Sequence, residues 1–174
     1  MSSYPKPNEY APYAKPYVDL VPTDVDIISH LKSHLDVYKE SINNFATSSL
    51  TTPHEEGEWT IQEVLMHVID VERIFSYRML RFGRQDTTEL AGFDQDAYVP
   101  TSRANERSVT SIMEEFTAVR HATITLVNSY SNEDLARPGV GSGFTVTVRG
   151  LLYHLAGHAI HHLDSIHENY GTSA

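Results

Sequence analysis

The chain has 174 residues, of which 40% are hydrophobic and 21% are charged, a composition typical of one soluble globular domain. Its formal net charge of −10 argues against a nucleic-acid partner, because phosphate-binding surfaces gather lysine and arginine. The chain has no cysteine, which excludes disulfides and thiolate zinc sites, so histidine and oxygen atoms would have to hold any metal.

Residues 1–22 are rich in proline and tyrosine and show no helical period. Tyr4, Tyr10, Tyr13 and Tyr17 offer apolar area that a solvated linker would not need, so we expect an extended N-terminal arm packed on the domain. The arm lacks the basic head and apolar stretch of a secretory signal. No segment approaches the roughly 18 consecutive apolar residues of a membrane span. We therefore expect a cytoplasmic protein without a membrane partner.

Residues 23–174 predict a single all-α domain, a four-helix bundle, because four segments repeat apolar residues at spacings of three and four. The first helix should follow Thr23 or Asp24 as its N-cap, because both side chains can accept from the first free N–H groups of a helix.

The second predicted helix has the clearest start. Thr60 and Glu63 form the capping-box pattern T-x-x-E, in which each side chain accepts from the other residue's backbone N–H group. This helix should run from near Trp59 to about Phe82, where Gly83 suits a left-handed C-cap.

A long connection separates the second helix from the third, whose apolar period runs from Val109 to Val127. A turn and a glycine-rich loop then precede the fourth helix. Thr147 can cap this helix, which should end at Tyr170 before Gly171. The segment "FTVTV" ahead of it has the alternation of a short strand but overlaps the helix cap.

The fourth predicted helix, "LLYHLAGHAIHHLDSIHENY", carries five of the ten histidines. At about 100° per residue, His158 and His162 fall beside each other at the edge of the apolar face, whereas His161 and His167 should be solvated. Two imidazoles one turn apart can chelate a metal but leave its coordination incomplete. His67 on the second helix is the candidate third ligand. A histidine beside an apolar face is more often a hydrogen-bonded core residue, so both interpretations stay open at this point.

Several catalytic motifs are absent from the sequence. H-E-x-x-H does not occur, which removes the commonest zinc peptidase pattern. E-x-x-H does not occur either, so a ferritin-like di-iron bundle is not expected. There is no P-loop, and no G-x-G-x-x-G follows a strand.

With these segments in place, the chain resembles the DinB-like superfamily of four-helix metal-binding proteins, which includes YfiT-type hydrolases and thiol-dependent transferases. The segment "EWTIQEVLMHVIDVERIFSYRML" is similar to the family's tryptophan-started helix with one histidine and a nearby D-x-E. The segment "EEFTAVRHATITLVNSYSNEDLAR" is similar to its F-x-x-x-R helix with an E-D-L turn. The segment "RGLLYHLAGHAIHHLDSI" resembles its closing G-H-x-x-H-H pattern. The resemblance spans nearly the whole chain.

The resemblance implies that His67, His158 and His162 are the metal ligands and that His154 packs beside them or supports them. Three protein ligands leave open positions for water or substrate. Neutral imidazoles suit several divalent metals, of which we rank zinc first and nickel second.

These expectations suggest a metal-dependent enzyme that activates either water, as a hydrolase, or a low-molecular-weight thiol, as a transferase. Its partner would then be a small-molecule substrate. The alternative is a non-catalytic helical bundle that binds a metal or another ligand. The sequence leaves the oligomeric state open, with a homodimer among the choices.

Two pairs of charged residues accompany the histidines. Asp94 and Asp96 lie in the long second connection and could line the mouth of the site, although turn-forming surface aspartates explain the pattern as well. Glu72 and Arg120 fall toward the inner faces of the second and third helices. Because buried charges usually need a partner, we expect these two to form a structural pair.

Overall fold

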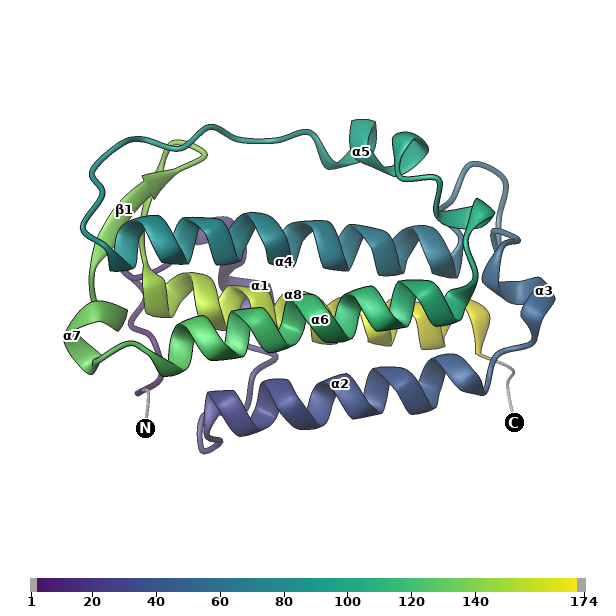
Figure 1. Ribbon diagram of the computed structural model, residues 1–174, viewed down its shortest axis with the longest axis horizontal. Coiled ribbons are helices and arrows are strands. Elements are labelled where there is room, and N and C mark those ends of the chain that lie inside the picture. Colours follow the sequence, from purple (N-terminus) through teal and green to yellow (C-terminus); the bar gives the residue numbers. More distant parts are fainter. Residues whose placement is uncertain (1–2, 172–174) are drawn as a thin grey trace.

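The computed structural model describes residues 3–171, and four long helices run side by side through it (Figure 1). These helices are α2 (Ile27–Asn43), α4 (Ile61–Gly83), α6 (Val109–Asn128) and α8 (Val148–Tyr170). The all-α four-helix bundle is therefore confirmed. Residues 1–2 and 172–174, at the ends of the predicted arm and domain, lie outside the described range.

Short elements connect the long helices. They are η1 (Pro12–Ala14), α1 (Lys15–Val18), α3 (Thr47–Leu50), α5 (Gln95–Thr101), η2 (Ala104–Glu106), α7 (Asn132–Leu135), β1 (Pro138–Gly141) and β2 (Phe144–Thr147).

Helix α4 packs against both α6 and α8, while α2 contacts the same two helices from the opposite side of the bundle (Figure 1). The apolar core follows these contacts in two clusters. One surrounds Phe75 and Leu152 and includes residues of the N-terminal arm. The other surrounds Leu65, Phe116 and Leu163 at the far end of the bundle. Within residues 3–171, none of the helices combines the length and hydropathy that crossing a bilayer would need.

The predicted capping box at the start of α4 is confirmed. The hydroxyl of Thr60 accepts from the backbone N–H of Glu63, and the Glu63 carboxylate accepts from the N–H of Thr60. The helix itself begins at Ile61, two residues after the expected start near Trp59.

The predicted N-cap of the first long helix is wrong. Helix α2 is capped by Asp26, whose carboxylate accepts from the N–H of Ser29, rather than by Thr23 or Asp24. Three candidate caps within four residues made the sequence ambiguous there, and the structure uses the last of them.

Gly83 does not form a left-handed C-cap. It is buried inside the last turn of α4, where a Cβ atom would lie 2.5 Å from the ring of Tyr130. The left-handed residue is Gln85, with a φ of 63°. Close packing against Tyr130, and not a left-handed backbone conformation, therefore favours glycine at this position.

A β-hairpin leads into α8. Strands β1 and β2 pair antiparallel, so the predicted strand exists over Phe144–Thr147. Ser142 and Gly143 make the turn with φ values of 53° and 78°, the left-handed pair of a type I′ hairpin. Thr147 then caps α8 as predicted, accepting from the N–H of Gly150.

The N-terminal arm packs against α8, but it is not wholly extended, because η1 and α1 form two short helical turns in it (Figure 1). Two glycines of α8 permit this contact. A Cβ atom on Gly150 would lie 1.8 Å from the carbonyl oxygen of Glu9, and a Cβ on Gly157 would lie 1.8 Å from that of Tyr17. The arm therefore crosses α8 at points where only glycine fits.

Candidate metal centre

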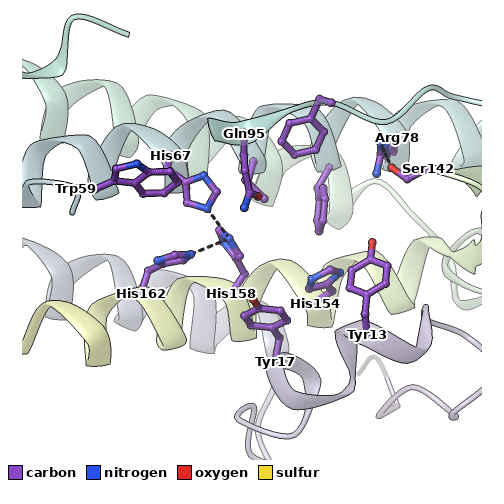
Figure 2. A pocket seen from close by; sticks show the side chains of 13 residues that line it. Tyr13, Tyr17, Trp59, His67, Arg78, Gln95, Ser142, His154, His158 and His162 are labelled. Carbon is purple, nitrogen blue, oxygen red and sulfur yellow. Dashed lines mark hydrogen bonds between the residues drawn. The ribbon is translucent and has the colours of Figure 1, made fainter. Parts of the chain in front are cut away.

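The structure brings His67 of α4 together with His158 and His162 of α8 (Figure 2). The Nε2 atom of His158 lies 3.0 Å from Nε2 of His67 and 3.1 Å from Nε2 of His162. One ligand atom from each residue lies within 4.8 Å of the other two. Two nitrogen ligands at zinc distances are about 2.9 Å apart at a right angle and about 3.4 Å apart at the tetrahedral angle. The donor set therefore fits a divalent cation.

A hydrogen-bonded histidine cluster explains the same contacts less well. Nε2 of a neutral imidazole carries either one hydrogen or one lone pair, so it can make only one good hydrogen bond. Nε2 of His158 nevertheless faces two other ring nitrogens at hydrogen-bond distance. A cation shared by three lone pairs would account for both contacts.

Burial keeps these imidazoles neutral. It lowers the pKa of His67 to about 4 and the pKa of His162 to about 3. The pKa of His158 falls well below its ordinary value, first through burial and then through repulsion from His162 and His67. Near neutral pH all three rings therefore present a lone pair, the form that binds a metal.

Residue spacing and contacts with neighbouring segments position the three histidine side chains. His158 and His162 are four residues apart and so lie one turn apart on the same face of α8. The hydroxyl of the buried Tyr38 donates to the carbonyl oxygen of Ala159 at 2.7 Å, which fixes α8 between the two histidines. On α4, the ring of His67 lies 5.1 Å from the ring of Trp59, measured between centroids.

The histidines line one end of a cavity of about 360 Å³ (Figure 2). Aromatic side chains from four different segments also line the cavity, and Arg78 and Ser142 lie at the end opposite the histidines. The aromatic residues are Tyr13, Tyr17, Phe75 and Phe93. A volume in this range suits a small organic molecule.

His154 forms part of the cavity wall one turn before His158. Its ring stacks on Tyr17 at a centroid distance of 5.2 Å and meets the edge of Phe75 at 4.9 Å. Burial lowers its pKa to about 4. His154 is thus a neutral ring beside the cluster and not a member of it, while His161 is exposed as expected.

Asp94 and Asp96 do not line the cavity. Asp94 caps α5, where its carboxylate accepts from the N–H groups of Asp96 and Ala97, so the turn-forming interpretation holds. Gln95 between them lines the cavity instead, and its side chain extends toward the histidines (Figure 2). The sequence predicted that this segment could line the mouth of the site, but no pattern in it indicated that the side chain of Gln95 would do so.

Glu72 and Arg120 form the predicted structural pair. Nε of Arg120 donates to both carboxylate oxygens of Glu72 at 2.9 and 3.0 Å, and Nη1 donates to the carbonyl oxygen of Leu31 at 3.1 Å. The two side chains are 0% and 1% exposed. They lie outside the cavity and join α4 to α6 and α2.

Comparisons with known proteins agree with the four-helix fold. The family model of the DinB superfamily matches residues 30–166. Among solved structures, YfiT from Bacillus subtilis, described as a probable metal-dependent hydrolase with an unusual four-helix bundle topology, is similar with a TM-score of 0.73. The alignment covers 96% of this chain and 91% of that chain at 15% sequence identity, so it shows a shared fold. No curated protein gives a significant match. Because the family model covers most of the chain, the protein belongs to the DinB superfamily.

Proposed function

We propose that the chain is a metal-dependent enzyme in which His67, His158 and His162 hold one divalent cation, with zinc ranked first and nickel second. The observation that carries the proposal is the convergence of three neutral imidazoles at one end of a cavity sized for a small molecule. A cation held there would supply Lewis acidity to water, giving a hydrolase, or to a low-molecular-weight thiol, giving a transferase.

The donor set favours a catalytic over a structural metal. Within residues 3–171, the cluster contains three histidines and no fourth histidine or carboxylate. Structural zinc sites are closed by four protein ligands, whereas catalytic sites keep a position open. The cavity beside the histidines gives a substrate access to that position.

The surrounding residues suit a reaction that develops negative charge. Aromatic rings line the cavity, and an apolar lining strengthens polar interactions inside it. The amide of Gln95 can donate a hydrogen bond to an oxygen that gains charge near the histidines. The ring of His154, whose pKa burial lowers to about 4, stays neutral near pH 7 and can take part in a hydrogen bond to the substrate.

The arm and the bundle should act as one functional unit. Tyr13 and Tyr17 belong to residues 1–22 and yet line the cavity together with residues of α4 and α8. We therefore propose that the 23–174 domain has a complete substrate site only with the arm in place.

Metal content is the first test. Protein purified without a metal-affinity resin or a chelator should contain close to one divalent cation per chain. Protein that takes up no zinc or nickel on titration would contradict the proposal.

Activity assays then separate the two chemistries. A hydrolase should turn over members of an ester and amide panel with metal and without thiol. A transferase should join a small thiol to an electrophile, and the thiol should perturb the visible spectrum of cobalt-substituted protein. Both activities should be lost in His162→Ala. Metal-loaded protein that is inactive in every assay would favour the non-catalytic alternative.

A further inference from the structure

Arg78 is a buried cation without a carboxylate partner in the protein. Its residue is 3% exposed, and none of the ion pairs within residues 3–171 includes it. Arg120, which is buried to a similar degree, is neutralised by Glu72. A buried charge without a counter-charge is costly, and an anion from outside the chain would supply the missing counter-charge.

The guanidinium of Arg78 is held through a single nitrogen. Its Nη2 atom donates to the carbonyl oxygen of Ala91 and to the hydroxyl of Ser142, each at 2.8 Å. Its Cζ atom lies 5.8 Å from the ring centroid of Phe75 and 5.9 Å from that of Phe93. In the described part of the chain, Nε and Nη1 donate to no acceptor. These two nitrogens therefore remain available to a ligand in the cavity that Arg78 lines.

The position of Arg78 relative to the histidines sets the shape of such a ligand. Arg78 follows His67 by eleven residues on α4, which corresponds to about 16 Å along the helix axis. Figure 2 shows Arg78 and Ser142 at one end of the cavity and the three histidines at the other. Tyr17 and His154 lie between the two ends, and Phe75 and Phe93 also line the cavity. A molecule that reaches both ends must carry a polar group at each end of an apolar body.

We propose that Arg78 binds the carboxylate of the substrate, so that the substrate is a small organic acid with an apolar or aromatic body. A carboxylate oxygen can accept a charge-assisted hydrogen bond from a guanidinium N–H that has no other acceptor. The body would lie against Phe75 and Phe93, and the reactive bond would reach the histidines. Only this reactive end rests on the proposed function, because the anion site itself needs no metal.

The test compares 3-phenylpropionate with its uncharged amide, 3-phenylpropionamide, by calorimetry on the zinc-loaded full chain. The acid should bind at least about tenfold more tightly, because hydrogen bonds to a charged group supply that difference. Arg78→Met should abolish the preference. Arg84→Met is the matched control, because Arg84 lies just after α4, is exposed and forms no ion pair within residues 3–171, so the preference should persist.

Equal affinity for acid and amide in the parent protein would overturn the proposal, and this result does not depend on whether Arg78→Met folds. A preference that survives in folded Arg78→Met would also overturn it, because the carboxylate would then be bound by the metal.

Repeating the titration on metal-free protein separates this proposal from the proposed function. A preference that depends on Arg78 in a protein without metal-dependent activity would support the anion site while the enzyme proposal fails. Zinc-dependent turnover of neutral esters without any preference for acids would leave the enzyme proposal standing and reject the anion site.

Discussion

Replacing Glu72 with methionine should destabilise the protein severely, because it leaves Arg120 charged and buried. Arg120 is 0% exposed, and the carboxylate of Glu72 accepts two of its three hydrogen bonds to protein acceptors. In Glu72→Met only the bond to the carbonyl oxygen of Leu31 would remain. Removing one partner of a buried ion pair typically costs about 3–5 kcal/mol.

This cost is large relative to the whole stability of a domain, which is about 5–15 kcal/mol. For a chain of this length it corresponds to a fall of about 6–20 °C in the melting temperature. Urea denaturation and calorimetry of metal-free protein would measure both quantities. Asp19→Asn is the control, because Asp19 pairs with Lys15 at the surface, where a salt bridge contributes little to stability.

The double variant, with methionine at both Glu72 and Arg120, tests the reasoning most directly. It removes the unpaired charge and fills similar volume, so it should be more stable than Glu72→Met alone. A cost below about 1 kcal/mol for Glu72→Met, or a double variant less stable than the single one, would refute the argument.

Three further predictions concern the site and the arm. His158→Ala should lose most of its bound zinc while His161→Ala retains it, and equal metal contents by mass spectrometry would contradict the ligand assignment. Metal-free protein should lose stability as the pH falls from about 6.5 to about 4, because in that interval His154 binds a proton only in the unfolded chain. His154 contributes about 3 kcal/mol to this change in the free energy of unfolding. Urea titrations of His154→Leu should therefore show a flatter dependence of that free energy on pH, and a slope equal to that of the parent protein would reject this origin. Gly157→Ala should lower the melting temperature and expose the arm to proteases, because its methyl group would lie 1.8 Å from the carbonyl oxygen of Tyr17. An unchanged melting temperature would show that close packing of the arm at Gly157 does not stabilise the protein.

The sequence predicted those features that depend on local pattern. The period of apolar residues and the Thr60–Glu63 capping box placed the long helices to within a few residues. The spacing of His158 and His162 predicted their shared face on α8, and the charges of Glu72 and Arg120 predicted a pair. Each of these follows from helix geometry or from the cost of an unpaired charge.

The remaining features depend on contacts between distant segments. Arg78 looks like any helical arginine in the sequence, and only the hairpin turn at Ser142 and the loop at Ala91 show that it faces a cavity. Gly83 fits a C-cap by pattern, but its role comes from Tyr130, 47 residues later. A single sequence carries no signal for such tertiary contacts.

The contact between the N-terminal arm and α8 determines when the cavity can fold during synthesis. The backbone N–H of Thr147 donates to the carbonyl oxygen of Glu9 at 2.9 Å, a contact between residues 138 positions apart. Contacts of such separation close large loops and form late in folding. During synthesis, a nascent chain that has not yet reached His162 lacks one histidine of the cluster, and its arm has no α8 to cover. The histidine cluster and the tyrosines that line the cavity beside it therefore cannot come together on the ribosome before α8 emerges, and a cation held by all three histidines could be enclosed only after that point.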